Sequence, residues 1–220
     1  MIELRNLTKS FATQRGRKYV ARDISAVFPS GRAVGLMGRN GAGKSTLLKI
    51  IAGSIPADSG DILSTGSISF PVGFAGTFHP DLTGMQNTRF IARIYGIDTT
   101  ELEEFVRDFA ALDDHYQMPV RSYSSGMRSR LAFGISMGIH FDTYLVDEVT
   151  SVGDAAFRRK SAAVFKDRMS RSGAIVVTHS MAELRNLCDC GAILEDGNLY
   201  FYENLSEAIA QHTRNMARAQ

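Results

Sequence analysis

Residues 33–51 of this 220-residue sequence read AVGLMGRNGAGKSTLLKII, and the fold can be worked out from this stretch. Residues 33–37 form a continuous apolar run that stops at Gly38, as expected of a strand buried on both faces. Residues 46–51 have the apolar spacing of a helix. The stretch therefore predicts a strand, a glycine-rich loop and a helix in succession.

The glycine-rich loop matches the phosphate-binding motif G-x-x-x-x-G-K-[ST] from Gly38 to Ser45. Such a loop points backbone N–H groups into one concavity beside a helix N-terminus, where anions are favoured. Lys44 can reach the β- and γ-phosphates of a nucleotide, and Ser45 can bind Mg²⁺. The four fixed positions match by chance with a probability of roughly 1% in a chain of this composition. The sequence thus predicts a nucleoside triphosphate site with Mg²⁺. The expected binding residues in the loop are Gly38, Asn40, Gly41, Ala42, Gly43, Lys44, Ser45 and Thr46.

Two further apolar runs, at 144–146 and 174–177, indicate buried strands parallel to the first. Asp147 and Glu148 follow one run, and His179 comes shortly after the other. We expect Asp147 to hold Mg²⁺ through water, as the acidic residue at such a strand end does beside a phosphate loop. Glu148 is expected to orient and activate the attacking water.

The remaining segments predict an antiparallel sheet and a helical insertion. Residues 2–8 and 24–28 alternate in hydrophobicity like strands, and the polar stretch 13–18 between them suits a hairpin turn or loop. Within 84–141, Thr100 and Glu103 have the spacing of a capping box. The apolar residues at helical spacing are Leu102, Phe105, Val106, Phe109 and Leu112. We interpret this stripe as core packing; the alternatives are a surface for a partner helix and a cofactor site.

Together these signals predict an α/β fold, with a P-loop NTPase core, an N-terminal antiparallel β part and an inserted α-helical subdomain. We expect one domain over residues 1–220. Its expected parts are a core lobe of about 1–83 and 141–205, a helical subdomain of about 84–140 and an amphipathic C-terminal helix of about 206–220.

Composition limits the classes of protein that this chain can be. Hydrophobic residues make up 44% and charged residues 22%, which is typical of a soluble globular protein. The net charge of +2 is too small to argue for a nucleic-acid or anionic-membrane partner. The sequence has neither a run of roughly 18 apolar residues nor an apolar N-terminal signal, so we expect it to stay in the cytosol. The spacing of Cys188 and Cys190 suits neither a redox pair nor a zinc knuckle, and we interpret both as inert thiols.

The order of these motifs resembles that of the nucleotide-binding subunit of ABC transporters over nearly the whole chain. Residues 123–127, YSSGM, are similar to the family's Leu-Ser-Gly-Gly-Gln signature. Residues 151–154, SVGD, resemble its D-loop, and His179 resembles its switch histidine. Phe11 stands where the family has an aromatic residue that stacks on adenine; the alternative is a phenylalanine of the core.

The resemblance implies an ABC ATPase fold and hydrolysis of ATP. It implies catalytic roles for Lys44, Glu148 and His179, and places Mg²⁺ at Ser45 and Asp147. The further ATP-binding residues that it implies are Phe11, Ser124, Gly126 and Asp154.

The resemblance also implies partners and a location. In the family the phosphate loop of one subunit faces the signature of another, which implies a head-to-tail homodimer that ATP closes and hydrolysis reopens. An integral membrane permease subunit and a peripheral place on the cytoplasmic face of the bacterial inner membrane are implied, and no nucleic acid is expected. The loop 70–84, with Phe74 and Phe78 exposed, and the helical insertion are expected to contact the membrane subunit. The alternative for these two phenylalanines is the core.

Two departures from the family pattern bear on the site. Ser125 and Met127 replace a glycine and the glutamine of the signature, while Ser124 and Gly126 keep the hydroxyl and the close backbone approach. Residues 70–80 contain no Q-loop glutamine, and Gln86 comes too late, so metal coordination from that loop is in doubt.

Residues 73–84 and 151–160 are similar to a narrower branch, the bacterial exporters of capsular polysaccharide, whose relatives export O-antigen and teichoic acid. The O-antigen relatives often carry a C-terminal carbohydrate-binding domain, for which 220 residues leave no room, so the capsule branch is favoured. The alternatives are an exporter of another cargo, a soluble ABC ATPase acting on nucleic acid or the ribosome, and a small P-loop kinase. Soluble ABC ATPases usually have tandem domains or a long coiled-coil insertion, and a kinase has no use for residues 123–127.

Overall fold

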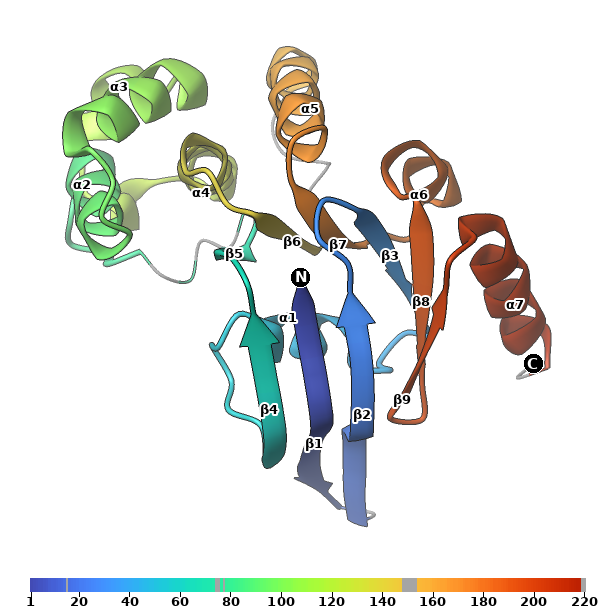
Figure 1. The fold of residues 1–220 in the computed structure, drawn as a ribbon. Helices are drawn as coiled ribbons and strands as arrows, with labels where there is room; N and C mark the ends of the chain where they lie inside the picture. The colour runs from blue at the N-terminus through green and yellow to red at the C-terminus, as the bar shows by residue number, and fades with distance from the viewer. Residues whose placement is uncertain (15, 74–75, 77, 148–153, 219–220) are drawn as a thin grey trace. The chain divides into compact units, whose positions relative to one another are not determined.

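The computed structural model describes residues 1–14, 16–73, 76, 78–147 and 154–218 (Figure 1). The chain divides into two compact units. We call the first the core unit; it comprises Met1–Pro71, Phe141–Glu148 and Met169–Gln220. We call the second the helical unit; it comprises Val72–His140 and Val149–Arg168.

The core unit contains a three-stranded antiparallel sheet in the order β2-β1-β4. The strands are β1 (Ile2–Thr13), β2 (Gly16–Phe28) and β4 (Ser59–Ser64). The strands expected at 2–8 and 24–28 are present, and the polar stretch 13–18 lies in the β1–β2 hairpin, which is one of its two expected forms. Pairing of β1 with β2 continues from Ile2↔Phe28 to Thr13↔Gly16, because cross-strand hydrogen bonding carries the hairpin beyond its hydrophobic part.

A six-stranded sheet completes the core unit, in the order β5-β6-β7-β3-β8-β9. The strands are β3 (Ala33–Met37), β5 (Ile68–Pro71), β6 (Thr143–Asp147), β7 (Gly173–Val177), β8 (Cys190–Glu195) and β9 (Asn198–Tyr202). The three apolar runs of the sequence are the adjacent parallel strands β6, β7 and β3, as predicted. Their carboxyl ends lie at one edge, so the phosphate loop, Asp147 and His179 follow neighbouring strands.

Among its described residues the core unit contains three helices, α1 (Lys44–Ile51), α6 (Met181–Leu187) and α7 (Leu205–Ala217). Helix α1 begins two residues before the expected Thr46. Helix α7 packs on β8, β9 and β3 through one buried face, which includes Ile209 and His212 (Figure 1). The C-terminal helix is therefore amphipathic, as expected.

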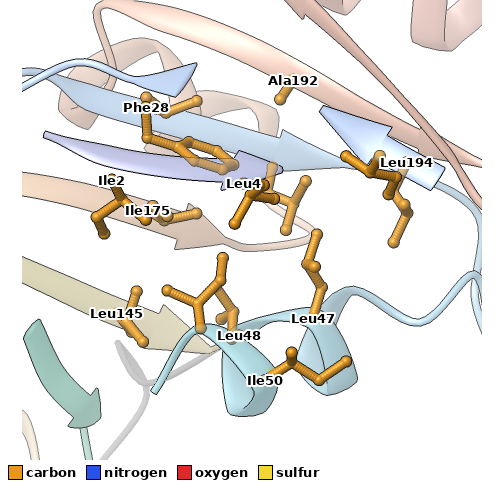
Figure 2. Packing of buried hydrophobic residues seen from close by; sticks show 14 of the residues in the cluster. Ile2, Leu4, Phe28, Leu47, Leu48, Ile50, Leu145, Ile175, Ala192 and Leu194 are labelled. Atoms are coloured by element: carbon orange, nitrogen blue, oxygen red, sulfur yellow. The ribbon is translucent and has the colours of Figure 1, made fainter. Parts of the chain in front are cut away.

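The core lies between α1 and both sheets of this unit. Figure 2 shows side chains from α1, β1, β2, β6, β7 and β8 gathered in one cluster. Leu47 and Leu48 of α1 are fully buried in it, beside Leu4 and Ile175. Burial of such side chains contributes about 1.5–3 kcal/mol each, so packing fixes the helix that follows the phosphate loop.

The helical unit contains four α-helices and two short 3-10 helices among its described residues. They are α2 (Gly84–Ile94), α3 (Thr99–Ala110), η2 (Asp113–Gln117), η3 (Val120–Ser122), α4 (Ser125–Gly138) and α5 (Ala155–Met169). The unit extends beyond the expected 84–140 because α5 packs on α3. The ring centroids of Phe157 and Phe109 are 5.3 Å apart, and Lys160 Nζ donates a 2.7 Å hydrogen bond to the carbonyl oxygen of Asp108.

The expected capping box at Thr100 and Glu103 is wrong. Asp98 caps α3 instead, because its carboxylate accepts hydrogen bonds from the backbone N–H groups of Thr100 and Glu101. Glu103 forms an ion pair with Arg89 at 2.6 Å.

The apolar stripe on α3 packs in the core of the helical unit, as interpreted. Leu102, Val106, Phe109 and Leu112 are buried, and the Phe109 ring stacks on Phe133. Phe105 is half-buried and stacks on Phe109.

We expect Leu48→Ala to lower the free energy of unfolding by about 2–5 kcal/mol, because it leaves a cavity in a fully packed core. Leu63→Ala is the matched control, since Leu63 is 43% exposed and its loss should cost much less. Urea unfolding of the two variants measures the difference, and equal losses would contradict this account of the core.

Candidate nucleotide site

The phosphate loop joins β3 to α1 and has a backbone that glycine alone fits at two points. Gly38 has φ 154°, and a Cβ there would lie 2.4 Å from the carbonyl oxygen of Leu194. Gly43 has φ 106°, and a Cβ there would lie 2.6 Å from Cγ1 of Val20. Neither position has space for a larger residue, so β8 and β2 close in on the loop from its two ends.

Lys44 folds back over this loop. Its Nζ donates hydrogen bonds to the carbonyl oxygens of Gly38 at 2.8 Å and of Arg39 at 3.1 Å. A positive charge therefore lies over the loop at the N-terminus of α1, where the helix dipole also favours anions. The loop can accept phosphate groups.

Ser45 and Asp147 provide oxygen atoms at one point of the site. The Ser45 hydroxyl donates to Asp147 Oδ1 at 3.0 Å, which joins the first turn of α1 to the end of β6. Hard oxygen atoms of this kind suit Mg²⁺, which keeps several waters and takes phosphate oxygens as further ligands. The described residues contain no cluster of three or more histidine, cysteine, aspartate or glutamate side chains that could hold a metal. The Ser45 and Asp147 oxygen atoms thus fit Mg²⁺ held together with a nucleotide.

A hollow of about 400 Å³ brings the expected residues of the core unit together. Its lining consists of Phe11, Lys18, Val20, Asn40, Gly41, Gly43, Lys44, Ser45, Thr46 and His179. Phe11 is 41% exposed on the β1–β2 hairpin, which excludes the alternative of a core residue. Lys18 and Val20 were missed by the sequence analysis, since they belong to no motif.

The two other loop residues line neighbouring hollows. Ala42 faces a hollow that it shares with Arg22 and Arg39, and Gly38 faces one that it shares with α7. The second of these hollows, of about 490 Å³, reaches from the loop and His179 to His212 and Met216.

His212 is a further residue that the sequence analysis missed. It is 9% exposed on α7. Burial lowers the pKa of its imidazole, the charge of Lys44 lowers it further, and the charge of Glu195 opposes the shift. The surroundings of His212 therefore favour its neutral imidazole.

Three expected residues belong to the helical unit. Ser124 is the N-cap of α4, and its hydroxyl accepts a hydrogen bond from the backbone N–H of Met127 at 3.2 Å. A Cβ at Gly126 would meet only the Ser124 hydroxyl, at 3.9 Å, so the backbone there is open to a ligand. Asp154 accepts hydrogen bonds from the Phe157 N–H at 2.9 Å and from Arg130 at 2.5 Å, and both lower the pKa of its carboxyl.

Several expectations fall outside the described residues. They concern Glu148, Phe74 and residues 151–153. Phe78 is half-buried, so the expectation that it is exposed is wrong.

Gln86 does not serve as a Q-loop glutamine, because its side chain caps a helix. Its side chain completes a capping box with Thr83 at the start of α2, accepting from the Thr83 N–H at 2.9 Å. This agrees with its late position in the sequence.

Comparison with known proteins identifies the family. Residues 21–151, more than half of the chain, match the sequence profile of the ABC transporter family. The chain belongs to the ABC transporter family. It is an ATPase of the ABC type, and the resemblance stated from the motifs is confirmed.

Two relatives are similar to this ABC protein over almost their whole length. The polysialic acid transport ATP-binding protein KpsT of Escherichia coli is 47% identical over 215 residues, which cover 96% of this chain and 96% of KpsT. The capsule polysaccharide export ATP-binding protein CtrD of Neisseria meningitidis serogroup B is 43% identical over 209 residues, covering 94% of this chain and 96% of CtrD.

A solved structure confirms the fold. It is a dimeric ATP-binding cassette in a post-hydrolysis state bound to ADP and Pi, and it has a TM-score of 0.75 to this chain with 21% identity. The match covers 93% of this chain and 99% of that one. The expected ABC ATPase fold is thus confirmed.

We expect His212→Gln to flatten the dependence of stability on pH. The pKa of His212 in the folded protein lies below its ordinary value of 6.5, so the unfolded chain takes up the proton first as the pH falls. Neutral His212 therefore contributes its full stability above about pH 6.5, the ordinary pKa. This contribution is lost as the pH falls from 6.5 towards the lower pKa of the folded protein.

Urea unfolding at about pH 7.5 and about pH 5.5 tests this, with a smaller loss of stability expected in the variant than in the wild type. His115→Gln, at an exposed site in η2, is the control and should keep the wild-type loss. An equal loss in all three proteins would contradict the assignment.

Proposed function

We propose that this chain is the ATP-hydrolysing subunit of an exporter that moves a polysaccharide, most simply a capsular one, across the inner membrane. The observation that supports a polysaccharide as the cargo is the similarity to KpsT and CtrD over nearly the full length of all three chains. Both proteins are named for the transport or export of such polymers. No helix among the described residues is long and apolar enough to span a bilayer. A separate membrane protein would supply the path.

The residues of the core unit would bind the nucleotide as follows. Phe11 would stack on the adenine ring, and Lys44 with the backbone of the phosphate loop would hold the β- and γ-phosphates. Ser45 and Asp147 would hold Mg²⁺, which neutralises the charge that develops on the phosphates. The hollow that contains Phe11, Lys44 and Ser45 supports this arrangement.

Hydrolysis would depend on two further groups. Glu148 follows the last residue of β6 and would orient and activate the attacking water. His179 follows β7 and lines the hollow beside Ser45, so it would contact the γ-phosphate side of the nucleotide. Both residues belong to the series of motifs recognised in the sequence.

Each nucleotide would also need a second copy of the chain. Ser124 and Gly126 offer a hydroxyl and an open backbone on the helical unit, and these would bind the γ-phosphate held by a partner subunit. A chain with one phosphate loop and one signature then forms two equal sites in a head-to-tail dimer. Closure on ATP and reopening after hydrolysis would drive the membrane subunit from its cytoplasmic side.

The membrane partner would contact the helical unit. Phe90 and Ile94 of α2 are 54% and 62% exposed, and Tyr95 and Met118 of the same unit are also exposed. Exposed apolar side chains of this size support a protein interface. They replace Phe78 as the expected apolar contacts.

Glu148→Gln should slow hydrolysis strongly and trap the ATP-bound dimer. Losing a general base reduces the rate by about 10²–10⁴-fold, while the binding groups remain. Phosphate release measures the rate, and light scattering with ATP and Mg²⁺ measures the dimer. Glu104→Gln, at an exposed site on α3, is the control and should hydrolyse ATP like the wild type. Unchanged hydrolysis in the Glu148 variant would refute its assigned role.

Export itself is tested in the host bacterium. In a strain lacking this chain, the wild-type protein should restore polysaccharide at the cell surface, whereas Glu148→Gln should leave the polymer inside the cell. Immunostaining of intact and permeabilised cells separates the two locations. Loss of surface O-antigen or teichoic acid, with capsule unaffected, would assign another cargo; no change in any surface glycan would overturn the export function.

A further inference from the structure

Lys18 lies in the nucleotide pocket although no motif contains it. It is on β2, directly opposite Phe11 of β1 in the antiparallel register. Side chains opposite one another in such a pair lie on the same face of the sheet. Both residues line the hollow that contains Lys44 and Ser45. One hairpin therefore carries an aromatic ring and an ammonium group into the same pocket.

The ammonium group of Lys18 is bonded to the phosphate loop. Its Nζ donates a 2.6 Å hydrogen bond to the carbonyl oxygen of Gly41, whose φ is 77°. A lysine ammonium has three donors, and this bond uses one of them. The same group can therefore hold the loop and donate to a phosphate oxygen together, and contacts between ionised groups of this kind are strong.

The position of Lys18 differs from that of Lys44 along the pocket. Lys44 is bonded at Gly38 and Arg39, whereas Lys18 is bonded at Gly41 and is the cross-strand partner of Phe11. If Phe11 stacks on the base, the phosphate nearest to the base faces Lys18, and the more distant phosphates face Lys44.

Stability alone gives little reason for a lysine at this position. Lys18 is exposed, and exposed polar contacts add little to stability. The hairpin is held by its backbone pairing from Ile2↔Phe28 to Thr13↔Gly16.

We propose that Lys18 is a further nucleotide-binding residue, which donates to the α-phosphate and ties the Phe11 hairpin to the phosphate loop. This inference rests on the proposed ATPase function of the pocket. It makes the hairpin part of the recognition of the phosphates as well as of the base.

The test compares the binding of adenosine, ADP and ATP by calorimetry in Lys18→Gln, Lys18→Arg and the wild type. Lys18→Gln should raise the dissociation constants of ADP and ATP by the same factor, about fivefold at low salt, and should leave that of adenosine unchanged. The factor should shrink as salt is added. Lys18→Arg keeps the charge and should bind within about twofold of the wild type. Arg17→Gln is the matched control, since Arg17 is the next residue along β2 and its side chain lies on the opposite face.

The outcomes separate this inference from the function on which it rests. Failure of the wild-type protein to bind ATP or ADP would overturn the proposed function. Normal binding by the wild type with no change in Lys18→Gln would overturn the role of Lys18 alone. If Lys18→Gln weakened adenosine binding as much as ATP binding, the inference would be overturned. It would also be overturned if Lys18→Gln lowered the thermal unfolding midpoint and Arg17→Gln lost as much nucleotide affinity, because both results would show a structural role.

Discussion

The close approach of the phosphate loop to the end of β8 is the constraint on which the nucleotide pocket depends. Gly38 lies against the carbonyl oxygen of Leu194, and no side chain fits between them. This contact fixes where β3 ends, and α1 then begins at Lys44 with its buried leucines packed on both sheets of the core unit (Figure 2). Because α1 is held in that place, Ser45 reaches Asp147 at the end of β6. The packing of the α1 leucines in the core thus positions the oxygen atoms of Ser45 and Asp147, which suit Mg²⁺.

Much of the fold could be predicted from the sequence because its signals are local. The apolar runs of β3, β6 and β7 have too few polar residues for any surface strand, and their parallel pairing follows from burial on both faces. Strand β4 could not be found in this way. Only Ile62 in it is even half-buried, so its extended form depends on backbone pairing with β1 and not on a hydrophobic pattern. The start of α3 was misplaced for a related reason, since Asp98 and Thr100 are both good caps and the choice depends on where the chain enters the helix.

The site shows the same division between local and tertiary information. The phosphate loop and Asp147 are each recognised within a few residues of sequence, because the loop backbone and the strand end determine their geometry. Lys18 and His212 are separated from the loop by many residues and come to it through hairpin register and helix packing. A sequence pattern within a few residues cannot predict contacts between segments so far apart in the chain. Gln86 illustrates the converse, since its side chain is used by a local capping box and is thereby accounted for without any ligand.

The cap at the start of α4 has a chemical consequence. A serine hydroxyl accepts and donates at once, and the bond from the Met127 N–H to Ser124 uses only its accepting side. One oxygen atom can therefore begin a helix with a lone pair and offer its hydrogen to an anion. Aspartate would keep the first ability and reverse the second, because a carboxylate accepts but does not donate. At this position serine and threonine combine a helix cap and a hydrogen-bond donor to an anion on one side-chain oxygen atom, which favours a hydroxyl in the signature for two independent reasons.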